Sequence, residues 1–375
     1  MRDSKVSIDN VFDYLDKPKG KVTIGVDGFV DEVWNVVSYR KGASEYVLFD
    51  KMNDFAGAIF ESDGGGFGAD TIRKRRTYGG FTANTGKAIS RLGVNLTMLA
   101  MFGKNNIDTV FSEFSDSCKV ISIGDPAICQ VYEFSDGKIM LPHVEDTASL
   151  DFKQLTASVS LNVLEEAYGC ADVVCLGYWS QLRFFDELVT KICENFLKPG
   201  AGGKRRKMFF DFAEIRTRER SALDETLQLL GMLNKDVSMT LSLNEHEAEV
   251  IYSLVGKQFK WQDFDANVGK ELELVRDKIG LDELVVHTPH FAIAASAFEE
   301  TAMLKQRYCE NPIITTGAGD NFNGGYIVAC VDSGLNLHER LFVSNATTGF
   351  YIRNGHSPDV NELKAEMSAA YDSLR

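Results

Sequence analysis

The chain is poor in proline and lacks metal-binding cysteine pairs, internal repeats and low-complexity tracts. It has 7 prolines in 375 residues, with 25% charged and 44% hydrophobic residues. This composition excludes a collagen-like or largely disordered chain. No CxxC pair is present, so we expect no structural zinc site and predict that the cysteines are reduced, buried thiols. They are Cys118, Cys129, Cys170, Cys175, Cys193, Cys309 and Cys330.

Positive charge is also scarce. The chain has 40 Lys and Arg residues against 54 Asp and Glu residues, a formal net charge of −14. Proteins that bind nucleic acid or anionic membranes generally need the opposite sign, so neither partner is expected. No apolar run approaches the ~18 residues of a membrane span. The polar start MRDSKVSIDN has no apolar core of a signal peptide, which predicts a cytoplasmic protein.

Short β-branched runs alternate with longer helical patterns along most of the chain. This alternation predicts an α/β fold with a mostly parallel sheet covered by helices on both faces. The expected strands are 21–27, 95–101, 172–178, 207–213, 236–243 and 283–288, and the expected helices are 82–93, 183–197, 219–233, 244–256, 318–332 and 338–352.

Two stretches break this alternation. Residues 28–78 contain aromatic residues and glycines without a long helical pattern, and residues 118–145 contain three β-like runs separated by GDP and SDG turns. Long stretches without helices are more often functional than idle. We expect the two insertions to pair into a small strand-rich lid on one domain spanning 1–375; two unrelated surface loops are the alternative.

Residues 312–334, PIITTGAGDNFNGGYIVACVDSG, are the most informative segment. Small residues at 317–319 let backbone N–H groups converge on an anion at a helix N-terminus. Asp320 then lies in the first helical turn. It either only stabilises the helix, or takes the proton from a hydroxyl that attacks a bound phosphate.

Several motifs together resemble those of the ribokinase-like (PfkB) carbohydrate kinases. TTGAGDNFNGG (315–325) resembles the C-terminal signature DTxGAGDxFxGG, and GGFTANTGKAISRLGVNLTMLAMFGKN (79–105) resembles the N-terminal GGxxxN segment. NEHE (244–247) resembles the NxxE motif, DFAEIR (211–216) the DxNxR pattern, and GVDGFVD (25–31) the first strand with its substrate-binding Asp. The resemblance covers about residues 21–356 and implies a ribokinase-like three-layer sandwich.

The resemblance also implies an activity, namely transfer of the γ-phosphoryl group of ATP to a hydroxyl of a small sugar or sugar derivative. By its motifs, Asp320 is the general base and the amides of Gly317, Ala318 and Gly319 form the anion hole. Asn244 and Glu247 organise Mg²⁺ and its waters, as suits a cation that keeps part of its hydration shell. For Glu247 the alternative is an exposed first-turn carboxylate.

The sugar and nucleotide positions follow from the same motifs. The substrate candidates are Asp27, Asp31, Gly79, Gly80 and Asn84. We favour Asp31 slightly over Asp27 as the carboxylate that binds sugar hydroxyls, although either could cap a turn. The nucleotide candidates are Thr288 and Asn345; the latter could instead bond to its own turn.

One departure from the family pattern leads to a prediction about monovalent cations. Ile314 stands where the family has an Asp that helps to hold potassium, and isoleucine has no oxygen to donate. We therefore expect weak or absent dependence on K⁺. Turnover compared in Na⁺ and K⁺ buffers of equal ionic strength tests this; a large increase in K⁺ would contradict it.

Two further departures affect the ligands. The family's TxGxxG pattern is replaced by HTPHFA (287–292), so His290 and Phe291 are expected to remodel the nucleotide contacts, and His287 or His290 could bind phosphate or be structural. RKRR (73–76) lies just before Gly79 and could attract phosphate groups, or be a solvated basic turn.

Three alternatives remain open at this stage. A nucleoside kinase of the same family is the nearest rival, and a non-catalytic sugar-binding relative with an altered HTPHFA loop is the other. A homodimer formed through the lid is also compatible with the pattern, because exposed strand edges need covering.

Overall fold

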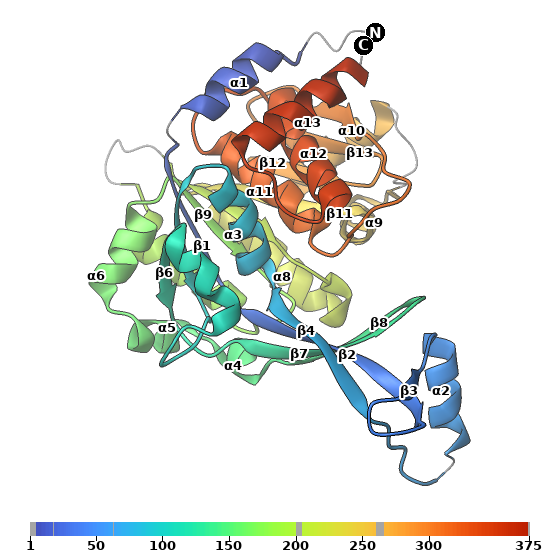
Figure 1. Cartoon of the computed structure of the whole chain (residues 1–375). Helices are drawn as coiled ribbons and strands as arrows, with labels where there is room; N and C mark the ends of the chain where they lie inside the picture. Colours follow the sequence, from blue (N-terminus) through green and yellow to red (C-terminus); the bar gives the residue numbers. More distant parts are fainter. Residues whose placement is uncertain (1–4, 18, 63, 200–204, 260–265, 374–375) are drawn as a thin grey trace.

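A mixed sheet forms the centre of the protein's body. The structure, a computed structural model, describes residues 5–17, 19–62, 64–199, 205–259 and 266–373. These residues form a nine-stranded sheet in the order β14-β13-β12-β11-β10-β9-β1-β5-β6 (Figure 1). Its strands are β1 Lys21–Val26, β5 Asn95–Ala100, β6 Lys119–Ser122, β9 Val173–Gly177, β10 Lys207–Asp211, β11 Ser238–Asn244, β12 Glu283–His287, β13 Phe291–Ser296 and β14 Ala302–Lys305. Only the β12–β13 and β13–β14 pairings are antiparallel.

Helices cover both faces of this sheet, which confirms the predicted α/β class. Side chains alternate along a strand, so β10 buries Phe209 in one core and Met208 and Phe210 in the other. The first core includes α1 Ile8–Asp16, α3 Phe81–Arg91, α11 Ala318–Cys330, α12 Leu337–Asn354 and α13 Val360–Ser373. The second includes α5 Phe152–Ser158, α6 Leu161–Leu164, α7 Phe185–Ile192, α8 Arg220–Leu233, α9 Glu245–Tyr252 and α10 Ala266–Ile279.

Short helical segments connect these elements. The 3₁₀ turns are η1 Thr109–Asp116, η4 Ile215–Thr217 and η5 Ser253–Val255, and the π-helical turns are η2 Glu165–Gly169 and η3 Cys193–Leu197. A short helix, α4 Glu145–Ser149, contacts β7. No helix in the described ranges has the length and apolar character needed to cross a lipid bilayer.

A second, five-stranded sheet projects from the body (Figure 1). It contains β2 Phe29–Arg40, β3 Tyr46–Leu48, β4 Thr71–Gly79, β7 Ala127–Phe134 and β8 Gly137–His143. β2 pairs with β4 antiparallel and with β7 parallel, so strands from both irregular stretches of the sequence meet in one sheet. They are therefore not two unrelated loops.

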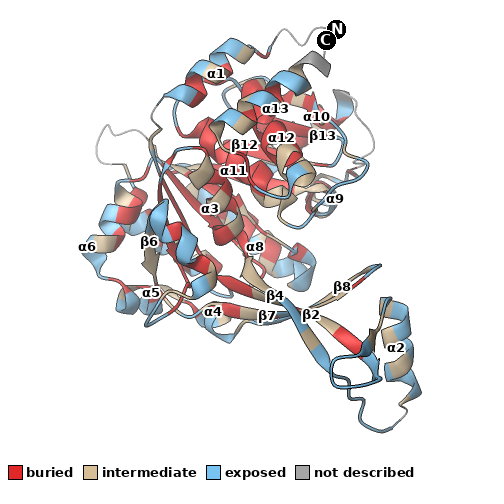
Figure 2. Cartoon of the chain, viewed as in Figure 1, coloured by how far each residue is buried: buried red, intermediate tan, exposed pale blue. Residues whose placement is uncertain are grey.

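The sequence-based boundaries of these stretches need two corrections. β6, expected to belong to the excursion, instead pairs with β5 in the main sheet. Residues 28–78 contain a helix, α2 Met52–Glu61, where none was expected. α2 lies at the far end of the second sheet and buries none of its residues (Figure 2). Its Phe55 contacts the rings of Phe49, Phe67 and Phe134, so a local aromatic cluster holds it there.

The prediction that the cysteines are buried is only partly correct. Cys129, Cys175, Cys193 and Cys330 are buried, whereas Cys170 is exposed. Cys118 and Cys309 are partly exposed.

Candidate active site

Asp320 lies in the first turn of α11, and α3 holds its carboxylate. Asn84 Nδ2 donates to Asp320 Oδ2 at 3.1 Å, and Thr85 Oγ1 donates to Oδ1 at 3.2 Å. Burial raises the pKa of Asp320 well above its ordinary value, and the nearby charge of Asp211 raises it further. The site therefore holds a carboxylate with unusually strong proton affinity, oriented by two hydrogen bonds.

Fewer backbone amides near Asp320 are available to bind an anion than the motif implies. Gly317 caps α11 in the left-handed conformation, with φ of 83°. The Ala318 N–H already donates to the Thr315 carbonyl at 3.1 Å. The first N–H groups of a helix have no partner within it. The amides of Gly319 and Asp320 are therefore the donors best placed for an anion.

Two cavities meet near this carboxylate. The first, here called the α11 cavity, measures about 620 Å³, and its lining includes Asp211, Asn244, His287, Thr288 and Asp320. The second, called the second-sheet cavity, measures about 760 Å³, and its lining includes Asp31, Arg75, Asn84, Lys138 and Tyr351. Thr315 lines both cavities. Because Asp320 and its donor Asn84 line different cavities, the carboxylate lies at the boundary between them.

Asp27 and Asp31 occupy different environments. Asp27 is fully buried, and its Oδ1 accepts from the Thr82 N–H at 3.0 Å and from Thr82 Oγ1 at 2.5 Å. Its Oδ2 has no partner among the described residues, and burial raises the pKa of Asp27 to about 6. Asp31 lines the second-sheet cavity, whereas Asp27 is not among the described residues that line either cavity.

Gly79 and Gly80 bring the backbone close to these two carboxylates. A Cβ on Gly79 would lie 2.8 Å from Asp31 Oδ2, and one on Gly80 would lie 2.2 Å from Asp27 Oδ2. Gly80 also has a φ of 88°, which disfavours other residues. The two glycines thus allow α3, which carries Asn84, to begin close to Asp27 and Asp31.

Asn244 and Glu247 form a capping box at the start of α9. Asn244 Oδ1 accepts from the His246 and Glu247 N–H groups, and Glu247 Oε2 accepts from the Asn244 N–H at 2.9 Å. Glu247 is buried, so the alternative of an exposed carboxylate is wrong. Burial and the charge of Asp211 raise the pKa of Glu247 well above normal.

These residues fit a cation bound through water. Glu247 Oε1 is buried and has no partner in the described part of the chain. Across the same residues, no group of three or more His, Cys, Asp or Glu side chains is placed to hold a metal directly. Mg²⁺ usually keeps several waters and uses one or two carboxylates, which this donor set can supply.

The HTPHFA segment forms the turn between β12 and β13. Thr288 Oγ1 donates to the Phe291 carbonyl at 2.9 Å and accepts from the Phe291 N–H at 3.0 Å. Phe291 is buried in the core, and the His290 ring stacks on Tyr308. Thr288 and Pro289 line the α11 cavity, whereas Phe291 is not among the described residues that line it.

His287 is partly buried beside Gly319 and Phe322. Burial lowers its pKa to about 4, so the ring is neutral near pH 7. Of the two roles considered for His287, phosphate binding by a protonated ring is not supported.

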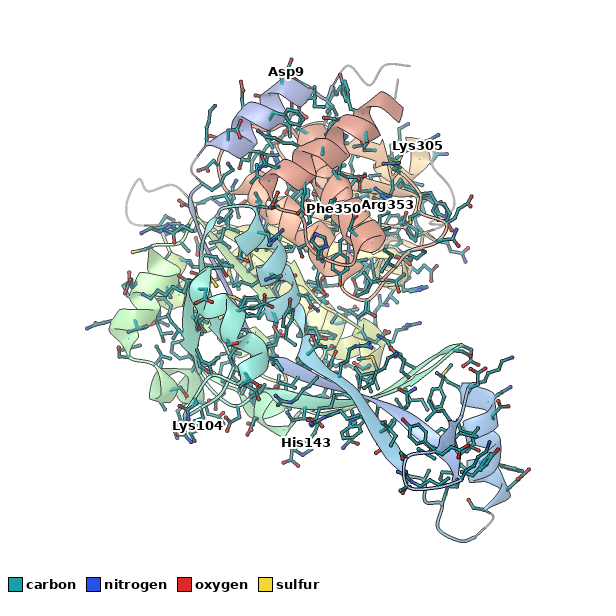
Figure 3. All side chains as sticks on the ribbon, in the orientation of Figure 1. Asp9, Lys104, His143, Lys305, Phe350 and Arg353 are labelled. Atoms are coloured by element: carbon teal, nitrogen blue, oxygen red, sulfur yellow. The ribbon has the colours of Figure 1, made fainter. Side chains whose placement is uncertain are left out.

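Asn345 faces a different hollow. Its Nδ2 lies 3.5 Å from the carbonyl oxygens of Leu304 and Lys305, rather than bonding to its own turn. The hollow measures about 180 Å³ and is also lined by Lys305 and Arg353, both labelled in Figure 3. The structure thus does not bring Asn345 into the α11 cavity; Thr348 and Ile352, later on α12, line that cavity instead.

The RKRR cluster lies on a strand, not in a turn. Arg76 donates to both carboxylate oxygens of Asp108 at 2.7 Å, and Lys74 and Arg75 pair with Glu133. Arg73 lies over the ring of Trp34. The cluster mainly ties the second sheet together, and most of its charge is compensated locally.

The structure adds residues that sequence reasoning assigned no role. Thr85 bonds to Asp320, and Lys138 reaches the second-sheet cavity from β8. Tyr178 is partly buried, has an unusual φ of 62° and lines the α11 cavity. Burial and then the charges of Asp27 and Asp320 raise its pKa well above normal. Its position directly after β9, at a carboxyl end of the sheet, was the available signal.

Known proteins resemble this chain over most of its length. The family model described as prokaryotic ketohexokinase matches residues 12–370. A ketohexokinase from Haloferax volcanii is 26% identical over 358 residues, covering 94% of this chain and 92% of that protein.

Solved structures share the fold at low identity. Arabidopsis thaliana ribokinase complexed with ribose and ATP has a TM-score of 0.63 and 15% identity, covering 94% of this chain and 99% of its own. A putative ribokinase II from E. coli in complex with ATP and Mg²⁺ has a TM-score of 0.61 and 16% identity, with coverage of 94% and 99%. These likenesses confirm the predicted ribokinase-like fold.

Proposed function

The chain belongs to the prokaryotic ketohexokinase family and is a carbohydrate kinase, and from that premise we propose that it phosphorylates a free ketohexose with ATP as donor and Asp320 as general base. The position of Asp320 at the boundary between the two cavities carries this proposal. A nucleotide in the α11 cavity and a sugar in the second-sheet cavity would meet at this carboxylate.

The proposed step is an in-line transfer. Asp320 accepts the proton of the attacking sugar hydroxyl while the new O–P bond forms and the bond to the ADP oxygen breaks. The raised pKa of Asp320 makes it a stronger base than an exposed aspartate. The amides of Gly319 and Asp320 stabilise charge on the transferred group.

Asn244 and Glu247 would hold the metal through its water ligands, with Glu247 Oε1 as the free acceptor. When bound, Mg²⁺ neutralises phosphate charge and orients the donor. Burial and the charge of Asp211 raise the pKa of Glu247. The Asp211 carboxylate is held in place by hydrogen bonds from the Ala213 N–H at 2.8 Å and from Asn323 Nδ2 at 2.5 Å.

The second-sheet cavity favours an acceptor without a phosphate. Asp31 and Asn84 offer hydrogen bonds to hydroxyl groups, and the negative charge of Asp31 disfavours an acceptor that carries a phosphate. Of the cations at this cavity, Arg75 is already paired with Glu133, and Lys138 donates to Thr316. We further propose that the second sheet serves as a lid over this cavity on a single kinase domain.

A substrate panel tests the function directly. ADP formation is measured with D-fructose, other ketohexoses, aldoses, sugar phosphates and nucleosides, each with ATP and Mg²⁺. We expect the highest kcat/KM with a free ketohexose. Preference for a nucleoside would identify a nucleoside kinase, and absence of both turnover and ATP binding would favour a non-catalytic sugar-binding protein.

The hydrogen bond from Thr85 predicts a pH effect. A general base works when deprotonated, so activity falls as the pH drops through the pKa of Asp320. Thr85→Val removes a donor that stabilises the carboxylate, so the pKa rises and the acidic limb of kcat/KM moves to higher pH, by roughly one unit for a bond of about 1.5 kcal/mol. Thr190→Val on α7 is the control and should leave the acidic limb where it is in the wild type. An acidic limb that is also unchanged in Thr85→Val would contradict this assignment.

A further inference from the structure

Lys138 links the second sheet to the start of the catalytic helix. It lies on β8, next to the β7–β8 turn, and its Nζ donates to Thr316 Oγ1 at 2.8 Å. Thr316 directly precedes Gly317, the N-cap of α11. Tyr351 Oη also donates to the Thr316 carbonyl at 2.8 Å, so the segment that Lys138 contacts is held in place from α12.

The β7–β8 turn is fastened at its other side as well. The Ser135 N–H donates to the Asp50 carbonyl at 2.7 Å, and Asp136 Oδ1 accepts from the Met52 N–H at 2.9 Å. Lys138 is therefore presented by a turn that is bonded both to the α2 end of the second sheet and to the body.

The charge of Lys138 distinguishes it from the other basic residues of the second-sheet cavity. Arg75 pairs with Glu133, Lys87 with Glu113, and His356 with Glu362. Among the described residues, the hydrogen-bond partner found for Lys138 is a neutral hydroxyl. Burial raises the pKa of Asp31, and the positive charge of Lys138 opposes this rise. Lys138 therefore lies close enough to act electrostatically on Asp31, the residue proposed to bind the sugar.

We propose, resting on the proposed function above, that Lys138 is a catalytic residue: its ammonium group contacts the transferred phosphoryl group and stabilises the negative charge on its oxygens. The anion donors supplied by the body are neutral amides, so a lysine bonded to Thr316, three residues before Gly319, adds a full positive charge. Lys138 takes no part in the proton transfer, because the proton of the sugar hydroxyl goes to Asp320.

This role would couple phosphoryl transfer to the position of the second sheet. Because Lys138 belongs to the second sheet, its charge is in place only while that sheet lies against the α11 segment. Any movement of the sheet away from this segment would therefore remove the charge from the phosphoryl group.

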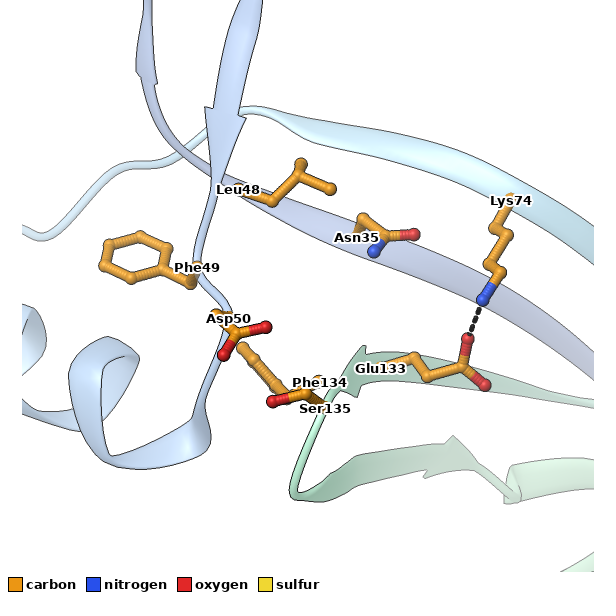
Figure 4. A pocket seen from close by; sticks show the side chains of 8 residues that line it. All are labelled: Asn35, Leu48, Phe49, Asp50, Lys74, Glu133, Phe134 and Ser135. Atoms are coloured by element: carbon orange, nitrogen blue, oxygen red, sulfur yellow. Dashed lines mark hydrogen bonds and ion pairs between the residues drawn. The ribbon is translucent and has the colours of Figure 1, made fainter.

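The test compares three variants of the full chain. Lys138→Met removes the charge and keeps the length, Lys138→Arg keeps a charge, and Lys74→Met is the control. Lys74 lies on the same sheet but lines another hollow, where it pairs with Glu133 (Figure 4). We expect Lys138→Met to lower kcat about 100-fold with the sugar KM changed less than about threefold, as for loss of a transition-state donor. Lys138→Arg should restore kcat to within about tenfold, and Lys74→Met should match the wild type.

A second readout separates this role from a structural one. ADP with aluminium fluoride and sugar mimics the transferred group, and its inhibition should weaken in Lys138→Met while inhibition by ADP alone is unchanged. A wild-type kcat in Lys138→Met, or a change confined to the sugar KM, would overturn the proposal. If the wild type phosphorylates no sugar at all, the proposed function fails independently of these comparisons.

Discussion

Replacing Asp320 with asparagine is expected to lower kcat with the preferred sugar by roughly 10³-fold, since a general base contributes about 10²–10⁴-fold. Asparagine keeps the shape and can still bond to Asn84 and Thr85, but it cannot accept the hydroxyl proton. The measurement is steady-state ADP formation at saturating sugar and ATP. A kcat within tenfold of the wild type would show that another group takes the proton.

The same substitution should not destabilise the protein. Burial and Asp211 raise the pKa of Asp320 in the folded state, so its ionised form opposes folding at pH values above that pKa. Asp320→Asn should therefore raise the melting temperature near pH 8. The gain should shrink as the pH falls through the folded-state pKa, where the wild-type carboxyl group becomes neutral. A lower melting temperature at pH 8 would indicate that the loss of activity reflects damage to the fold.

Replacing Asp31 with asparagine is expected to raise the sugar KM by about 10–100-fold with little change in kcat. Hydrogen bonds to a charged group contribute about 1.5–3 kcal/mol, and an interaction made equally in the ground and transition states affects KM alone. Asp31 lines the second-sheet cavity, so its carboxylate is available to sugar hydroxyls. The measurement is the sugar dependence of ADP formation at saturating ATP.

Asp27→Asn is the matched comparison. Asp27 Oδ1 holds Thr82 at the start of α3, so its substitution is expected to alter the melting temperature more than the sugar KM. The reverse pattern, with a large KM effect for Asp27→Asn and a small one for Asp31→Asn, would make Asp27 the sugar ligand. This pair decides between two residues that the sequence left nearly equal.

The sequence was most informative where function and local structure depend on the same short segment. The GAG turn followed by an apolar helical pattern predicted both the start of α11 and the place of Asp320 in its first turn. The NEHE motif likewise predicted the start of α9 at Asn244. A left-handed glycine begins α11 and a capping box begins α9, and both act within four residues, so neighbouring residues in the sequence suffice.

Errors arose where a strand or helix is defined by distant partners. β6 has the same β-branched character as β7, but it pairs with β5 and so belongs to the other sheet. α2 buries none of its residues and is held by aromatic contacts with Phe49, Phe67 and Phe134, so its own pattern is weak. Asn345 lies on the expected helix, but the sequence could not show that its side of the helix faces a different hollow from the α11 cavity.

The low proline count and the absent cysteine pairs only excluded other classes of protein. The strand–helix alternation determined the α/β class, because hydrophobic periodicity and turn chemistry are local properties of the chain. The motifs also determined which chemical groups are available. Only the tertiary structure decided that Asn84 and Thr85 hold Asp320, more than 230 positions away, and that Lys138 reaches Thr316 from a separate sheet. It also shifted the pKa values, since burial raises those of Asp320 and Glu247 and lowers that of His287. Contact and burial depend on packing between distant segments, which no local pattern encodes.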